Sequence, residues 1–208
     1  MTSATPTWPG QSALSEASLS RLTELVALLG KWNRAINLVA PSTLGDVWRR
    51  HVADSAQVFD LCPADARVWL DMGSGGGFPG LVVAILSAEK RPGLQVELVE
   101  SDQRKCAFLQ NAAQVLGLGA KVTRARIEDL APRSADVVSA RALAALPVLC
   151  GYALPNLAPH GVCLFLKGAG IAAEVEAARR SYRFDLTLFP SHTDPSGVVA
   201  QLSDLSHV

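Results

Sequence analysis

The chain contains 208 residues, of which 49% are apolar and 18% are charged. This length is typical of one domain, and the apolar fraction excludes a wholly disordered chain. Nineteen basic residues balance nineteen acidic ones, which excludes nucleic-acid binding through a large positive excess but leaves a local basic face possible.

The N-terminal part is predicted to be a tail followed by a helix. Residues 1–14 are rich in Thr, Ser, Pro and Gly and are expected to form a loose tail. They lack the basic and apolar regions of a secretory signal peptide. Apolar residues at helical spacing predict a helix from Ser18, which Gly30 is expected to bend or end.

A second helical region is predicted after an extended stretch at residues 37–41, where a proline disfavours helix. The hydroxyls at residues 42–43 are expected to cap a helix that continues to about Leu61. His51 and Asp54 are three positions apart in it, so their side chains can meet. We interpret them as a structural pair that docks this region onto the next motif, although a catalytic pair is the alternative.

From residue 64 onward, short apolar runs alternate with helical segments. Strands are predicted at 67–71, 95–100, 121–125, 136–140, 162–168, 184–189 and 198–202. Helices are predicted between them at 81–87, 102–116, 143–152 and 171–183, with Ser101 capping the second and Gly117 closing it. This alternation predicts an α/β fold with a doubly wound, mostly parallel sheet and an antiparallel last strand. We therefore expect a helical extension over 1–63 and one compact domain over 64–208.

A glycine-rich loop follows the first predicted strand. Five glycines occur within eight residues of the stretch 71–80, which reads DMGSGGGFPG. Such a turn lets the backbone approach a ligand where a Cβ would clash. Pro79 suits the first turn of the helix that follows. The ligand is expected outside the carboxyl ends of the strands, where the strand order reverses.

Two ligands are compatible with glycines at this spacing. Residues 75–80 match the dinucleotide pattern GxGxxG, and Glu100 lies 20 residues beyond Gly80. Asp71, however, precedes the first glycine by two residues and gives Asp-x-Gly-x-Gly-x-Gly, the usual S-adenosylmethionine (SAM) loop of Rossmann-like methyltransferases. An acid there suits the amino group of SAM and would repel a pyrophosphate. SAM is favoured, while a nicotinamide or flavin nucleotide, or a glycine turn without a ligand, stays open.

The predicted cofactor contacts lie on this loop and at the ends of the following strands. Glu100 is expected to accept hydrogen bonds from both ribose hydroxyls. Ile127 is expected to contact the adenine, although Glu128 beside it is also compatible with a helix start. The full predicted set is Asp71, Gly73, Ser74, Gly75, Gly77, Phe78, Glu100, Ile127, Glu128 and Arg141.

Seven short motifs occur in a characteristic order. They are KWN at 31–33, NL at 37–38, RHVADS at 50–55, the glycine loop, KCAFL at 105–109, SARA at 139–142 and LKG at 166–168. In this combination the chain resembles the RsmG (GidB) family of bacterial SAM-dependent methyltransferases, which act on N7 of a guanine in 16S ribosomal RNA. The resemblance spans about residues 20–170. It implies SAM contacts at the positions that match Gly73, Phe78, Ile127, Glu128 and Arg141.

Two departures from the family pattern are visible. The family often has Ser-Arg-Ala where this chain has Ser-Ala-Arg-Ala at 139–142, although Arg141 still matches. Residues 191–208 contain no Lys or Arg, which puts an RNA-contacting role of the C-terminus in doubt. A basic rim is predicted instead near the strand ends, with scattered solvated charges as the alternative. Its members would be Arg34, Arg49, Arg50, Arg104, Lys105, Arg124, Arg126, Arg141 and Lys167.

The predicted reaction needs little acid–base chemistry. Guanine N7 carries a lone pair and no proton, so positioning alone can lower the barrier by roughly 7–11 kcal/mol. Arg141 is the candidate catalytic residue, because a guanidinium can bind guanine, phosphate or the methionine carboxylate. A helix-start arginine paired with a nearby acid is the alternative. We expect replacement of Arg141 by alanine to abolish methyl transfer and to leave the fold intact.

The expected partner is 16S rRNA, a small ribosomal subunit or an assembly intermediate. We expect a cytoplasmic monomer with no membrane contact, no metal site and four reduced, mostly buried cysteines. A SAM-dependent small-molecule methyltransferase, or a non-catalytic nucleotide-binding assembly module, are the alternative functions.

Overall fold

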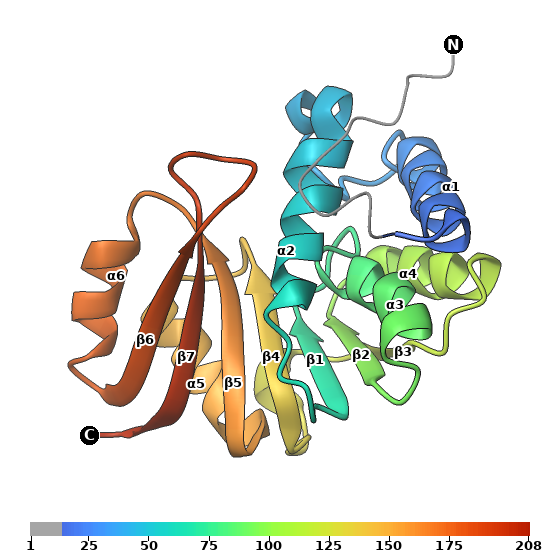
Figure 1. Ribbon diagram of the computed structural model, residues 1–208. Coiled ribbons are helices and arrows are strands. Elements are labelled where there is room, and N and C mark those ends of the chain that lie inside the picture. The colour runs from blue at the N-terminus through green and yellow to red at the C-terminus, as the bar shows by residue number, and fades with distance from the viewer. Residues whose placement is uncertain (1–13) are drawn as a thin grey trace.

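A seven-stranded sheet with the order β3-β2-β1-β4-β5-β7-β6 forms the centre of the molecule (Figure 1). The computed structural model describes residues 14–208, so the predicted tail lies almost entirely outside the described residues. The strands are β1 Val68–Met72, β2 Gln95–Glu100, β3 Lys121–Arg124, β4 Ala135–Arg141, β5 Leu157–Lys167, β6 Tyr182–Pro190 and β7 Val198–His207. β7 runs antiparallel to both of its neighbours, β5 and β6, whereas β1 to β5 pair in parallel in the described sheet. The predicted fold class is thereby confirmed.

Helices cover both faces of this sheet (Figure 1). The α-helices are α1 Glu16–Trp32, α2 Asp54–Asp60, α3 Gly80–Lys90, α4 Gln103–Val115, α5 Leu146–Ala153 and α6 Ile171–Ala178. Alternation along the strands divides the core in two. Trp69 of β1 joins the apolar cluster under α1 to α4, whereas the next residue, Leu70, joins the cluster under α5 and α6.

Two local predictions about helix ends need correction. Gly30 does not end the first helix, because α1 continues through it to Trp32. The cap of α4 is Asp102 rather than Ser101, and its side chain accepts hydrogen bonds from two backbone N–H groups of the first turn. Gly117 does close α4, with a φ of +62°. Asp and Ser are comparable caps, so the sequence alone could not separate two adjacent candidates.

Residues 41–60, between α1 and β1, are helical but change their helical geometry twice. A 3₁₀ helix, η2 (Pro41–Asp46), is followed by a π-helix, η3 (Trp48–Ala53), and then by α2. No side chain caps η2, so the predicted cap at residues 42–43 is wrong. Pro41 instead occupies the first turn, where its missing N–H has no intrahelical partner to lose. In Figure 1 this region rises above the carboxyl ends of the parallel strands.

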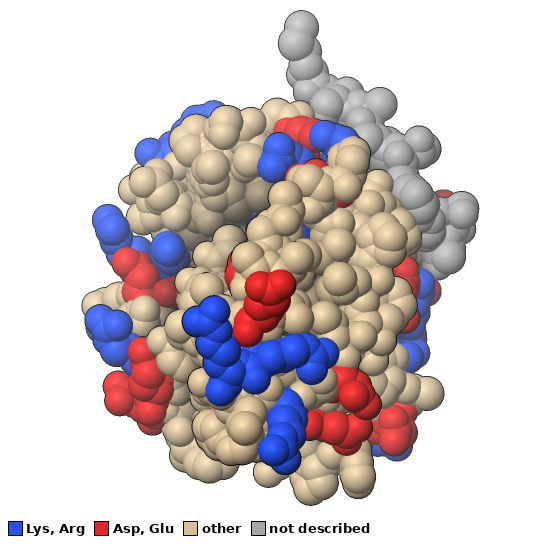
Figure 2. Space-filling model, turned by 90° about the vertical axis from the view of Figure 1, so that its left-hand side faces the viewer, with Lys and Arg blue, Asp and Glu red and all other residues tan. Residues whose placement is uncertain are grey.

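Charged residues of both signs are interspersed on the face that α6 and β6 present. Figure 2 shows Lys and Arg lying directly beside Asp and Glu there, with a large uncharged area above them. This arrangement does not form the uniform basic surface that binding by bulk charge requires. All four cysteines are free and buried, as expected. No helix among residues 14–208 is long and apolar enough to cross a membrane.

Candidate active site

A cavity of about 590 Å³ opens beside the carboxyl ends of the central strands. The glycine loop, the ends of β2 and β4, the turn after β3 and the segment before η2 all line it. Eight of the ten predicted contact residues face this cavity: Gly73, Ser74, Gly75, Phe78, Glu100, Ile127, Glu128 and Arg141. Asp71 and Gly77 do not line it. The structure therefore brings most of the predicted site together from four separate segments of the chain.

The glycine loop is held by its own backbone and by close packing. Gly73 and Gly75 adopt φ values of +65° and +52°, a region that other residues rarely enter. The N–H of Ser74 donates to the carbonyl oxygen of Val99 at 2.9 Å, which ties the loop to β2. A Cβ on Gly76 would lie 2.9 Å from the carbonyl oxygen of Leu38, so the loop also packs against the segment before η2.

Asp71 acts behind the loop rather than inside the cavity. It is fully buried, and its carboxylate accepts hydrogen bonds from the Ser139 hydroxyl at 2.7 Å and the Gly80 N–H at 3.2 Å. The indole N–H of Trp69 donates in turn to the Ser139 hydroxyl at 2.8 Å. Burial raises the pKa of Asp71 to about 6, although these bonds oppose the shift. This carboxylate joins β1, β4 and α3 behind the loop, while its predicted contact with a ligand amino group stays a prediction.

Glu100 is oriented by three backbone donors at the end of β2. One carboxylate oxygen accepts from the N–H of Gly75 at 2.9 Å, and the other accepts from the N–H groups of Ser101 and Asp102 at 2.8 and 2.9 Å. Carboxylate oxygens have further acceptor capacity, and Glu100 lines the cavity. It can therefore accept from two neighbouring hydroxyls of a ligand, such as those of a ribose.

The turn after β3 supplies another wall of the cavity. Residues 127–129 form a short 3₁₀ helix, so the helix start left open at Glu128 is present together with the cavity contact. Tyr152 of α5 donates its hydroxyl to the Glu128 carboxylate at 2.8 Å and also lines the cavity. The sequence analysis missed Tyr152, since a single tyrosine in an apolar helix carries no signal of its own.

Arg141 lies at the end of β4 and is fixed by residues of η3. Its guanidinium donates to the backbone carbonyl of Arg50 at 3.1 Å and contacts Nδ1 of His51 at 2.6 Å. It also lies over the Phe78 ring, 5.2 Å from the ring centroid. His51 stacks on the same ring with a centroid separation of 5.1 Å. The glycine loop, η3 and β4 therefore meet at one arginine, Arg141.

The proton position on His51 follows from these partners. A guanidinium has only donors, so Nδ1 of His51 accepts from Arg141. Nε2 therefore carries the proton and donates to the Thr43 hydroxyl at 2.8 Å. Burial, followed by the charges of Arg141 and Arg50, lowers the pKa of His51 to about 3. His51 is therefore neutral and serves as an acceptor that orients Arg141.

The predicted pairing of His51 with Asp54 is wrong. Asp54 instead accepts from the hydroxyls of Ser191 and Thr193, in the loop between β6 and β7. Both residues lie at the junction of a π-helix and an α-helix, where the α-helical spacing of three no longer aligns side chains. The expected docking of this region onto the glycine loop nevertheless occurs, through the stacking of His51 on Phe78.

We expect His51 to make the fold sensitive to acid. The pKa of His51 is lower in the folded state than its ordinary 6.5, so the stability it contributes is present above pH 6.5 and is lost as the pH falls towards 3. His51→Asn retains an acceptor for Arg141 but cannot titrate. The difference in unfolding free energy between the native chain and this variant should therefore narrow on acidification by a few kcal/mol. Chemical denaturation at a series of pH values measures it, and a constant difference between pH 7 and 4 would contradict the assignment.

Part of the predicted basic rim lies at the cavity. Lys105, Arg126 and Arg141 line the cavity. Lys167, by contrast, is held by an ion pair with Glu174 and by the carbonyl oxygen of Ala144, and Arg49 pairs with Asp46. Among residues 14–208, no group of three or more His, Cys, Asp or Glu residues is arranged to hold a metal ion.

Comparisons with known proteins agree with this geometry. Residues 18–194 match the family described as rRNA small subunit methyltransferase G (GidB). A ribosomal RNA small subunit methyltransferase G from Cereibacter sphaeroides is 51% identical over 203 residues, which cover 95% of this chain and 98% of the relative. Among solved structures, cofactor-bound Rv0187 from MTB gives a TM-score of 0.62 at 18% identity, covering 96% of this chain and 98% of that one. A SAM-dependent methyltransferase from Aquifex aeolicus gives 0.58 at 13% identity, covering 85% and 97%.

Proposed function

Because the chain belongs to the rRNA small subunit methyltransferase G family, we propose that it transfers a methyl group from SAM to N7 of one guanine in 16S ribosomal RNA. The observation that supports this most directly is Arg141, which lines the cavity beside the glycine loop and also faces a second, polar pocket on its other side. The proposal includes a cytoplasmic monomer that acts on small-subunit RNA. Residues 64–208 would bind the cofactor, while the helical extension covers the loop and orients Arg141.

The residues present in the cavity fit SAM. The Glu100 carboxylate suits the two ribose hydroxyls, and Ile127 offers an apolar contact for the adenine with Glu128 beside it. Ser74, Gly73 and Gly75 provide a backbone surface without bulky side chains for the methionine part. Phe78 forms an apolar wall beneath Arg141. These residues suit a ligand of mixed polarity, such as an adenosyl sulfonium.

The main contribution that methyl transfer to N7 requires from the protein is to position the reacting groups. When bound, SAM supplies an electrophilic methyl group on a sulfonium sulfur, and the C–S electron pair stays with sulfur as N7 forms the new bond. N7 carries no proton, so no general base is required. Arg141 can bind the base or its phosphate and thereby hold N7 in line, while the Phe78 ring and neutral His51 keep the guanidinium in place. Such positioning accounts for a large share of the barrier in reactions of this type.

Transfer of labelled methyl groups from SAM to purified small-subunit RNA tests the proposal, with mass mapping of the product to locate the modified base. We expect label on one guanine of 16S rRNA and the mass of one added methyl group. Label in small molecules of a cell extract, but not in RNA, would support a small-molecule methyltransferase. Cofactor binding without transfer to any component would support a non-catalytic assembly module. Either result would overturn the proposal.

Glu100 should determine cofactor affinity. Glu100→Gln replaces one acceptor oxygen with an amide donor, which cannot accept from a ribose hydroxyl or from the backbone N–H groups now bound there. We expect the dissociation constant for SAM to rise by roughly 10- to 100-fold, as for loss of a hydrogen bond to a charged group. Titration calorimetry measures this change. Glu176→Gln, on α6, is the matched control, and equal affinities for both variants would contradict the assignment.

A further inference from the structure

A polar pocket adjoins the cofactor cavity on the other side of Arg141. We call it the Arg–Asp pocket and define it by Arg50, Asp54, Arg141 and Asp194. Two hollows of about 290 Å³ each share Asp54, Arg141 and Asp194, and one of them also includes Arg50. Arg141 lines these hollows and the cofactor cavity alike. A group bound in the Arg–Asp pocket would therefore lie next to the cofactor.

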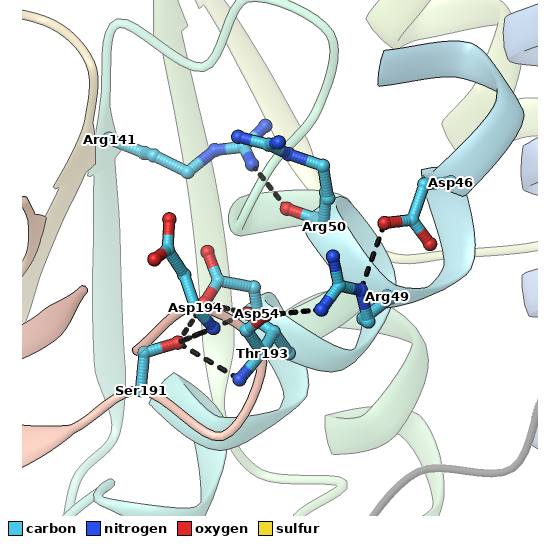
Figure 3. Close-up of polar contacts among 8 residues, drawn as sticks. All are labelled: Asp46, Arg49, Arg50, Asp54, Arg141, Ser191, Thr193 and Asp194. Atoms are coloured by element: carbon cyan, nitrogen blue, oxygen red, sulfur yellow. Dashed lines mark hydrogen bonds and ion pairs between the residues drawn. The ribbon is translucent and has the colours of Figure 1, made fainter. Parts of the chain in front are cut away.

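The two kinds of charge in this pocket are held apart. Figure 3 shows the guanidinium groups of Arg50 and Arg141 side by side, with the carboxylates of Asp54 and Asp194 turned towards them from below. No ion pair joins either arginine to either aspartate in the part of the chain that the structure describes. The pocket thus presents free donors on one side and free acceptor positions on the other.

Asp54 is the more buried of the two acceptors in the pocket. It is partly buried, and its Oδ1 accepts from the hydroxyls of Ser191 at 3.2 Å and Thr193 at 3.0 Å. No hydrogen bond to its Oδ2 is present among the described residues, and this side of the carboxylate faces Arg141 in Figure 3. Asp194 is similar, since its Oδ1 is bound by Ser196 through both N–H and hydroxyl. Each aspartate therefore keeps one oxygen for a ligand.

The mixed charge selects against simple ions. A phosphate group would be attracted by Arg50 and Arg141 but repelled by Asp54 and Asp194 at the same pocket. A cation would be attracted by the two aspartates but repelled by the two arginines. A neutral group with acceptors on one edge and donors on the next can bind the arginines and the aspartates together. Guanine is such a group, because O6 and N7 accept while N1–H and the 2-amino group donate. Adenine has no N1–H donor and no O6 acceptor.

We propose that the Arg–Asp pocket binds the target guanine, with Asp54 and Asp194 accepting from N1–H and the 2-amino group and Arg141 donating to O6. This inference rests on the proposed function and specifies how that site recognises its base. O6 and N7 are neighbours on the purine. With O6 held by Arg141, which lines both spaces, N7 faces the cofactor cavity and keeps its lone pair free. The pocket would thus provide base specificity and orientation together.

Three variants separate base recognition from loop anchoring. Asp54→Asn keeps an oxygen for the Ser191 and Thr193 hydroxyls but replaces an acceptor with a donor. Asp194→Asn makes the same change at the rim. Ser191→Ala, the matched control, loosens the loop and leaves both carboxylates intact. We expect kcat/KM for small-subunit RNA to fall by about 10- to 100-fold in Asp54→Asn, while the dissociation constant for SAM stays within twofold. In Ser191→Ala, kcat/KM for small-subunit RNA should fall much less than in Asp54→Asn.

Inosine gives a readout that loop anchoring would not change, because it is guanosine without the 2-amino group. Small-subunit RNA is prepared by ligation with guanosine or inosine at the methylated position. The native enzyme should prefer guanosine by about 10-fold. In the Asp54→Asn/Asp194→Asn double variant this ratio should fall to about one. The inference would be overturned if the double variant kept the native preference for guanosine over inosine, or if the native enzyme showed no such preference. It would also be overturned if Asp54→Asn lowered the KM for RNA, a result that would indicate a phosphate site. Absence of transfer to RNA by the native enzyme would instead refute the proposed function itself.

Discussion

Replacing Arg141 by alanine is expected to lower the rate of methyl transfer by about 100- to 1,000-fold, the effect typical of removing one preorganised donor from an active site. The guanidinium lines both the cofactor cavity and the Arg–Asp pocket. It is held in place by the Arg50 carbonyl, His51 and the Phe78 ring. Single-turnover transfer to small-subunit RNA measures the loss.

A second variant, Arg141→Lys, distinguishes a positioning role of Arg141 from the effect of its positive charge alone. Arg141→Lys keeps the positive charge but removes the planar fork, so it should recover only a small part of the rate. Both variants should still fold, since Arg141 lies at the end of β4 rather than in either apolar cluster, but Arg141→Ala should unfold at a somewhat lower temperature because buried His51 loses its donor. Near-native turnover in Arg141→Ala would show that this residue does not act on the base.

Replacing Gly80 by alanine is expected to cost about 1–3 kcal/mol of stability through overpacking. A Cβ at this position would lie 2.1 Å from a methyl carbon of Leu98 and 2.6 Å from a carboxylate oxygen of Asp71. Both neighbours are fully buried, and Asp71 is fixed by the Ser139 hydroxyl. The clash cannot be relieved without moving α3 from β1 and β2. Chemical denaturation measures the change in unfolding free energy.

Gly30→Ala is the matched control for Gly80→Ala. Gly30 lies inside α1, and an added Cβ there meets nothing within 4 Å. Alanine is the better helix former by about 1 kcal/mol, so this variant should be slightly more stable than the native chain. The two substitutions are chemically identical and should have opposite signs. A neutral or stabilising Gly80→Ala would contradict the close contact between α3 and the strands.

The sequence predicted the strands better than the helical extension. Apolar runs that end in an acid, such as 67–71 and 95–100, are signals that burial in a parallel sheet produces directly. Between Pro41 and Asp60 the chain changes from 3₁₀ to π to α geometry, and the spacing of apolar residues does not predict such changes. The error over His51 and Asp54 followed from this, because the α-helical spacing was applied to residues that leave a π-helix.

The candidate site was predicted where its residues lie on recognisable motifs. The loop glycines, Glu100 and Arg141 follow strands, and the fold gathers strand ends at one edge of the sheet. Asp71 lies outside the cavity lining, because its carboxylate points into the interior towards Ser139 and Gly80, which the sequence alone does not show. The partners of Asp54 lie about 140 positions away in the chain, on the loop after β6. Long-range pairing of this kind depends on tertiary structure, and a single sequence contains no signal for it.

The position of β7 determines when the sheet and the loop at Asp54 can be completed. β7 follows β6 in the chain, yet it lies between β5 and β6 and pairs with both. Until residues 198–207 insert between them, β6 has no partner in the described sheet, and the loop that binds Asp54 cannot be closed. Pairing of strands that are distant in the sequence, such as β5 and β7, is slow compared with local folding. A chain without residues 198–207 would therefore lose the strand that joins β6 to the rest of the sheet, and with it the closed loop beside Asp54.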